Sequence, residues 1–279
     1  MKVVKTIKLF IGGEFPRTES GYSFAVHEFK TKNVYAQLCQ ASRKDFRNAV
    51  TAAQSGFHSW SSKTAFNRSQ ILYRMAEMFE GQRQEFTEIM SKTLGKTSKQ
   101  CADAIDASID ALVYFAGFAD KYQQVMGAVN PVSGPHHNFT SCEPVGVVAH
   151  IPAEKFDLPR LVSEIAGIIC SGNAVVTLLP EEGAAVIAPL SEVFATSDLP
   201  KGVINLLTGE RSSLISQAAE HMEVQSICSG LKDLNSQGKI RLATSGNLKR
   251  FVTTSKPKLN LESITDFVEF KTVWHPIGY

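Results

Sequence analysis

The spacing of apolar residues changes near residue 135, and the two halves of the chain predict different architectures. In the first half, apolar residues recur every three or four positions, which is the period of a helix packed against a core. The longest such segment, residues 98–126, predicts one helix. Its apolar face consists of Cys101, Ile105, Ile109, Leu112, Phe115, Ala119, Tyr122 and Met126.

Shorter elements are predicted before that segment. Two short strands are expected within residues 7–29, separated by a glycine turn and a polar loop. A helix begins after Ser42, because Asp45 three positions later completes a capping box. Two more helices follow, and Gly95 ends the second of them.

Strands and helices alternate in the second half. Such alternation predicts a parallel sheet with right-handed crossovers. The expected fold class is therefore α/β: a Rossmann-like doubly wound parallel sheet preceded by an N-terminal helical segment. The predicted strands are residues 145–151, 174–178, 202–207 and 224–227, and the predicted helices are residues 158–170, 184–194 and 212–219.

Composition narrows the classes of function. The chain has 279 residues, 43% apolar and 20% charged, which is ordinary for a soluble globular protein. Its 29 basic and 27 acidic residues give a net charge of +2, so no nucleic-acid or membrane partner is expected. The chain shows no signal-peptide or membrane-spanning pattern, and a cytoplasmic location is expected.

The five cysteines are widely spread and odd in number, which favours a reduced protein without disulfides. They form no C-x-x-C pair, and no metal site is predicted. The adjacent His136 and His137 have no carboxylate or cysteine in register and are interpreted as a solvated loop. His150, at the end of a predicted strand, is expected to be a hydrogen-bonded sheet residue.

Several segments occur in the order and at about the spacing of the aldehyde dehydrogenase superfamily. They are KLFIGGEF, SRKDFRNAVTAAQSGFHSW, FNRSQILYRMAEMFEGQRQEF, DALVYFAGFADKY, EPVGVVAHIP, SGNAVV, LPKGVINLLTG and TSGNLKRFV. The chain resembles a shortened member of that superfamily over roughly residues 8–254. The resemblance implies an N-terminal and cofactor-binding domain formed by residues 1–136 and 145–262. It also implies a small antiparallel oligomerisation arm formed by residues 137–144 and 263–279.

The sequence departs from the family where the chemistry would lie. The family's glutamate-leucine-glycine-glycine motif and catalytic domain should follow TSGNLKRFV, but Thr254 stands near the place of the general-base glutamate. Only a dozen or so residues separate the sheet from the arm, so the catalytic domain is expected to be excised. Lys155 replaces the asparagine that stabilises the oxyanion. No cysteine carries the motif of the family nucleophile, and no catalytic residue is predicted.

The resemblance also implies a site for NAD or NADP at the carboxyl ends of the parallel strands. Leu179 replaces a lysine of that site, and the glycine of the phosphate-binding turn is displaced by one position. We therefore expect dinucleotide binding to be impaired or absent. The residues that would contact the cofactor are Ile151, Pro152, Leu179, Glu182, Gly209, Ser229 and Gly230.

The segment FVEFKTVW places large apolar residues on both faces of a strand, which one subunit would bury poorly. It is expected to pair with residues 137–143 and to reach a second subunit, in a homodimer or in a hetero-oligomer with a full-length aldehyde dehydrogenase. The predicted function is a non-catalytic assembly or regulatory subunit of an aldehyde dehydrogenase. The alternatives are an NAD(P)-binding module and an oxidoreductase subunit that is active only with a partner chain.

Overall fold

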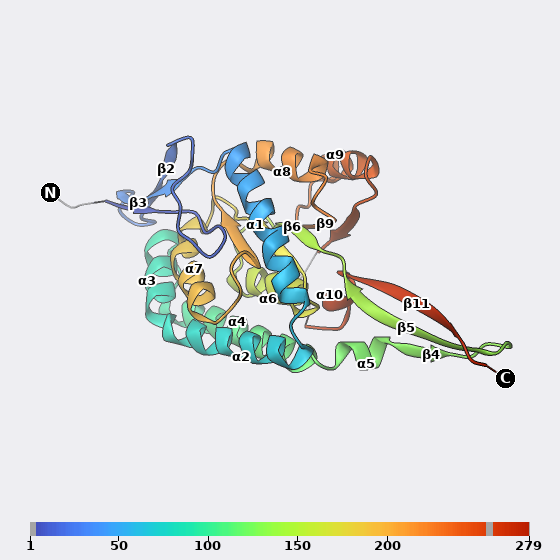
Figure 1. The fold of residues 1–279 in the computed structure, drawn as a ribbon. Coiled ribbons are helices and arrows are strands. Elements are labelled where there is room, and N and C mark those ends of the chain that lie inside the picture. Colours follow the sequence, from blue (N-terminus) through green and yellow to red (C-terminus); the bar gives the residue numbers. More distant parts are fainter. Residues whose placement is uncertain (1–3, 255–258, 279) are drawn as a thin grey trace.

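Five parallel strands form the central sheet of the computed structural model, which describes residues 4–254 and 259–278 (Figure 1). The strand order is β10-β9-β6-β7-β8, and every neighbouring pair is parallel. The predicted doubly wound α/β fold is therefore confirmed. The strands are β6 (Val147–Ile151), β7 (Ala174–Leu178), β8 (Ile204–Leu207), β9 (Ser226–Ser229) and β10 (Arg250–Thr253).

Helices cover both faces of this sheet. Alternate residues of a strand point to opposite faces, and Val147 and Ala149 accordingly pack with α1 and α8, while Val148 packs with the core around α6. Strands β6 and β7 are rich in valine, and every residue of these two strands is buried. The helices after β6 are α6 (Leu158–Cys170), η1 (Ala184–Val186), α7 (Ile187–Thr196), α8 (Arg211–Glu220), α9 (Leu234–Ser245) and α10 (Glu262–Thr265).

The N-terminal half supplies a small sheet and five helices. The predicted capping box is present, because Ser42 and Asp45 bond to each other's backbone amides at the start of α1. Gly95 ends α3 in the left-handed conformation, with φ of 69°. The elements are β1 (Lys5–Ile7), β2 (Ser23–His27), β3 (Val34–Cys39), α1 (Arg43–Ser61), α2 (Ala65–Gly81), α3 (Arg83–Leu94), α4 (Ser98–Phe118) and α5 (Tyr122–Met126).

One helix prediction was wrong, and one helix was not predicted. The segment 98–126 is not one helix, because α4 ends at Phe118 and α5 begins at Tyr122. Lys121 donates from its side chain to the carbonyl of Gly117 and from its backbone amide to that of Phe118, and these bonds satisfy the end of α4. Helix α9 was not predicted at all, since only Ile240 and Thr244 of that helix are buried and it has no apolar face of normal width.

A three-stranded antiparallel sheet extends from the body and carries the C-terminal strand (Figure 1). Its strands are β4 (Ala128–Asn130), β5 (His136–Pro144) and β11 (Val268–Pro276), in the order β11-β5-β4. We call this sheet the arm. The predicted pairing of the C-terminal strand with residues 137–143 is confirmed, because β11 pairs with β5 from Val268 opposite Pro144 to Pro276 opposite His136. Residues 255–258 of the connection to the arm lie outside the described residues.

Candidate functional site

The carboxyl ends of β6 and β9 meet at the point where the strand order reverses. Strand β6 lies between β7 and β9, so the chain leaves it in one direction and returns to its other side. Ligands of open α/β sheets bind in the crevice at such a switch point. Ile151 and Ser229 are register partners there, and the amide of Gly230 donates to the carbonyl of Ile151 at 2.8 Å.

The other residues predicted to contact a cofactor lie along the same carboxyl edge. Pro152 is buried directly after β6. Leu179 is buried after β7, and its amide donates to the carbonyl of Leu207 at 2.9 Å. Gly209 follows β8 with φ of 130°, and a side chain there would meet the backbone amide of Ala41 at 3.0 Å. Glu182 is exposed in the turn before η1.

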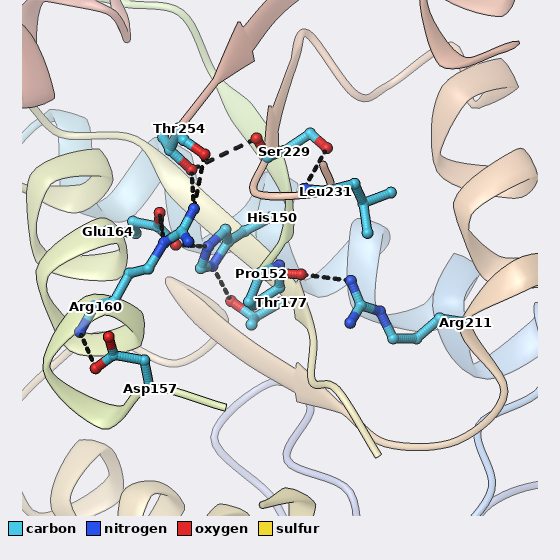
Figure 2. A network of polar contacts seen from close by, with 10 residues as sticks. All are labelled: His150, Pro152, Asp157, Arg160, Glu164, Thr177, Arg211, Ser229, Leu231 and Thr254. Carbon is cyan, nitrogen blue, oxygen red and sulfur yellow. Dashed lines mark hydrogen bonds and ion pairs between the residues drawn. The ribbon is translucent and has the colours of Figure 1, made fainter. Parts of the chain in front are cut away.

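The crevice between β6 and β9 is occupied by a side chain from α6. Arg160 is 7% exposed, and its Nε donates to Oε1 of Glu164 at 2.9 Å. Its Nη2 donates to the carbonyl oxygen of Thr254 at 2.7 Å and to the hydroxyl oxygen at 3.0 Å (Figure 2). The same nitrogen lies only 2.7 Å from where a side chain on Gly230 would begin. Arg160 therefore joins α6 to the ends of β9 and β10.

His150 extends this buried network to the next strand. It is fully buried in β6, with Nε2 2.8 Å from Oε2 of Glu164 and Nδ1 3.3 Å from the hydroxyl of Thr177. A carboxylate only accepts hydrogen bonds, so Nε2 carries the proton that is shared with Glu164. The expectation that His150 is a hydrogen-bonded sheet residue is confirmed.

Neighbouring side chains stabilise the negative charge of Glu164. Burial alone would raise the pKa of this carboxyl, but the hydrogen bond from His150 and the charges of His150 and Arg160 lower it to about 2. Glu164 thus remains ionised at neutral pH although its side chain is only 6% exposed. An ion pair buried to this degree is costly to break by removing one partner.

A second arginine lies across the end of β6. Arg211 is the first residue of α8, and its Nη2 donates to the carbonyl oxygen of Pro152 at 2.5 Å (Figure 2). Its Nε is buried and has no hydrogen-bond partner within the described residues. Burial lowers the pKa of Arg211 to about 10, although the nearby Glu154 acts in the opposite direction.

An aromatic side chain packs on the turn that follows β7. Phe156 is 5% exposed and packs directly on Gly183, where a Cβ atom would lie 2.3 Å from the ring. Gly183 also has φ of 77°, so both its conformation and this contact require glycine. Phe156, Arg160 and Arg211 thus lie along the edge at which a ligand of this fold would bind, and the first two line a cleft there.

Two hollows remain beside these side chains. The first, which we call the outer cleft, has a volume of about 530 Å³ and contains more basic than acidic side chains. The second, the α8–α9 groove, has a volume of about 370 Å³ and lies between those two helices. Ala153, next to Pro152, lines the outer cleft, and Ser212, next to Arg211, lines the groove. The bond between Arg211 and Pro152 therefore links the margins of the two hollows.

The cysteines of this chain are poorly suited to act as thiolate nucleophiles. All five cysteines are buried and free. Burial raises the pKa of Cys170 to about 12 and raises that of Cys228, at the carboxyl edge, well above its usual range. A thiolate nucleophile needs the opposite shift. In the described ranges no three His, Cys, Asp or Glu side chains are grouped to hold a metal ion.

The two arginines were not predicted from the sequence. The signal for Arg160 was present, because Arg160 and Glu164 are spaced four apart in a helix whose other residues are almost all apolar. Such a pair inside an apolar helix indicates a buried ion pair. Arg211 gave no comparable signal, since α8 has polar residues on both sides of it.

The parallel sheet, its switch point and the helices that start along one edge define an α/β protein of the dinucleotide-binding type. The aldehyde dehydrogenase family profile matches residues 16–229, and the chain belongs to that family. It is 30% identical to the mitochondrial benzaldehyde dehydrogenase of Antirrhinum majus over 247 residues, which are 87% of this chain and 45% of that protein. It is 28% identical to the cytosolic aldehyde dehydrogenase 1 of Elephantulus edwardii, covering 94% of this chain and 50% of that protein.

Solved structures agree with this assignment. The NAD⁺ complex of an aldehyde dehydrogenase from Bacillus cereus superposes with a TM-score of 0.82 at 26% identity, over 89% of this chain and 50% of that one. The chain thus spans about half the length of the relatives that it matches. None of the helices in the described part of the chain is both long and apolar enough to cross a bilayer.

Proposed function

We propose that this chain is a non-catalytic assembly subunit of the aldehyde dehydrogenase family and that the arm is its docking element. The arm carries the proposal, because it projects from the body (Figure 1) and because its strand β11 exposes large apolar side chains. Trp274 is 61% exposed, Phe270 is 49% exposed and Val273 is 42% exposed, all on β11. An exposed apolar strand at a sheet edge is a place where another chain binds.

The carboxyl edge of the central sheet supports the non-catalytic part of the proposal. The buried thiols are poor nucleophiles, and Lys155 stands where the family resemblance implies an amide donor. Arg160 and Arg211 occupy the crevice with hydrogen bonds to Thr254 and Pro152. An arrangement of this kind commits both arginines to hydrogen bonds that stabilise the fold.

The molecular mass in solution tests the assembly role. The purified chain, alone and mixed with a full-length aldehyde dehydrogenase from the same source, is examined by analytical ultracentrifugation. We expect a complex whose stability falls when Trp274→Asp places a charge on the arm. Phe66→Asp is the matched control, since Phe66 is 64% exposed on α2. A monomer that binds neither itself nor the full-length enzyme would contradict the proposal.

A second candidate function, an NAD(P)-binding module, is favoured by the α8–α9 groove. Its walls include Ile215, Ala219 and Ile240, and it opens near the first turns of two helices. Helix N-termini favour phosphate groups, and apolar walls favour a flat ring. Calorimetric titration with NAD and NADP tests this function, with Ala219→Trp as the variant that fills the groove. Absence of heat and of a thermal shift at millimolar ligand would exclude it.

A further inference from the structure

Among the described residues, β11 pairs with a strand on one side only, so its outer edge has open backbone groups whose positions follow from the pairing with β5. The carbonyl of Phe267 accepts from the amide of Val145, and the amide of Ile277 donates to the carbonyl of Pro135 at 2.9 Å. Backbone groups of successive residues in an antiparallel strand point to opposite edges. Odd-numbered residues of β11 therefore face β5, and even-numbered residues present their N–H and C=O groups outward.

The open part of this edge is short and bounded at both ends. The carbonyl of Val268 already accepts a hydrogen bond from Nη1 of Arg250 at 2.6 Å. Pro276 has no N–H group to donate. The outward groups that remain belong to Phe270, Thr272 and Trp274. Val268 and Pro276, which close the two ends, are equally distant from Thr272.

The side chains around Thr272 are complementary to themselves. When two copies of β11 lie antiparallel with Thr272 opposite Thr272, Phe270 of each copy faces Trp274 of the other. Glu269 faces His275, and Lys271 faces Val273, so no two like charges are opposed. Aromatic cross-strand pairs and pairs of opposite or neutral character stabilise antiparallel sheets. Phe270 and Trp274 are both exposed in a single copy, as is the rest of β11 after Val268.

We propose that two copies of this chain pair through β11, antiparallel about a two-fold axis at Thr272. The two three-stranded arms then join into one continuous sheet, with β11 no longer at an edge. The interface is isologous, so β11 pairs with one other copy only, and the short β4 strands form the two ends of the joined sheet. This pairing rests on the proposed assembly function and specifies its geometry and its partner.

A proline at the axis tests the pairing through the backbone. Thr272→Pro removes an outward N–H group and leaves the hydrogen bonds of β11 to β5 in place, because proline is tolerated at strand edges. We expect the wild-type chain to sediment at twice its mass of 30.5 kDa, and the dissociation constant to rise at least about tenfold in Thr272→Pro. Thr272→Val is the control. It also loses the hydroxyl bond to Thr140 but keeps the N–H group, so it remains a dimer.

A cross-link tests the register. Thr272→Cys places two thiols opposite each other across the axis, and mild oxidation is expected to give a disulfide-linked dimer, since the native cysteines are buried. Lys271→Cys is the control. Position 271 of one copy lies diagonal to position 271 of the other, beyond the ordinary reach of a disulfide.

The outcomes separate this inference from the proposed function. A wild-type dimer in which Thr272→Pro has no effect and Thr272→Cys does not cross-link would overturn the β11 pairing and leave the assembly role standing. A chain that is monomeric alone but binds a full-length family member would likewise overturn the β11 pairing and leave the assembly role standing. A chain that is monomeric under both conditions would overturn both. Folding of each variant is checked by far-ultraviolet circular dichroism and by the unfolding midpoint in urea.

Discussion

The guanidinium of Arg160 binds both the backbone carbonyl and the hydroxyl of Thr254, at 2.7 and 3.0 Å. This contact fixes the end of β10 to α6, directly before the connection that leads to the arm. The family resemblance places a general base near Thr254, and here the hydroxyl at that position bonds to Arg160 and to the carbonyl of Ser229. A position associated with chemistry thus has a structural role.

Removal of Arg160 is expected to be strongly destabilising. Arg160→Met keeps the apolar bulk but leaves the carboxylate of Glu164 buried with one partner fewer, and breaking such a pair costs about 3–5 kcal/mol. Urea unfolding measures the change. Lys44→Met is the control, because Lys44 pairs with Glu19 at the surface, where an ion pair contributes about 0–1 kcal/mol. Equal losses in the two variants would contradict the buried-pair interpretation.

The pH dependence of stability should contain a contribution from Glu164. The pKa of this group is about 2 in the folded chain and 4.5 as its ordinary value, so the stabilisation is complete above pH 4.5 and is lost as the pH falls toward 2. The loss is about 3 kcal/mol. Unfolding of the wild-type chain and of Glu164→Gln is compared at pH 7, 4 and 3. Parallel curves for the two proteins would show that Glu164 does not contribute.

Arg211 is expected to limit the binding of dinucleotides. Its guanidinium bonds to the carbonyl of Pro152 at the end of β6, and Arg211→Ala would remove this side chain from the carboxyl edge of the sheet. We expect the affinity for NAD to rise by roughly tenfold, measured by the fluorescence of NADH and by calorimetry. Arg241→Ala is the control, since Arg241 of α9 carries the same charge and lies over the ring of Phe251. Unchanged or weaker binding in Arg211→Ala would show that Arg211 does not obstruct the crevice.

The cysteines are expected to be inert in the folded protein. Burial raises the pKa of Cys101, Cys142, Cys170 and Cys228, so few thiolates form at neutral pH. Ellman's reagent should titrate no thiol rapidly in buffer and all five thiols in concentrated urea. A thiol of the native chain that reacts within seconds would reopen the question of a nucleophile.

Much of the fold was predictable because local signals and burial agree. The helix at Leu158–Cys170 and the strand at Ala174–Leu178 have the predicted bounds, since Asp157 caps the former and both faces of the latter are apolar. Helix α9 was missed because a helix on the surface needs few apolar residues. The break after Phe118 was missed because α5 continues the apolar spacing of α4.

The site was less predictable than the fold. The residues inferred from the resemblance do lie along one edge, because the carboxyl ends of parallel strands share an edge. Their environment depends on side chains that reach in from other elements, such as Phe156 on Gly183 and Arg160 on Thr254. Contacts of this kind join positions far apart in the chain, and no local pattern encodes them.

The pairing of β5 with β11 also imposes an order on folding. Thr140 and Thr272, whose hydroxyls share a hydrogen bond, are 132 positions apart. The whole central sheet is synthesised between them, so β5 has only the short β4 to pair with until β11 has been synthesised. The pairing of β5 with β11 therefore forms only after the central sheet has been synthesised, and docking through β11 is restricted to chains whose synthesis has passed that strand.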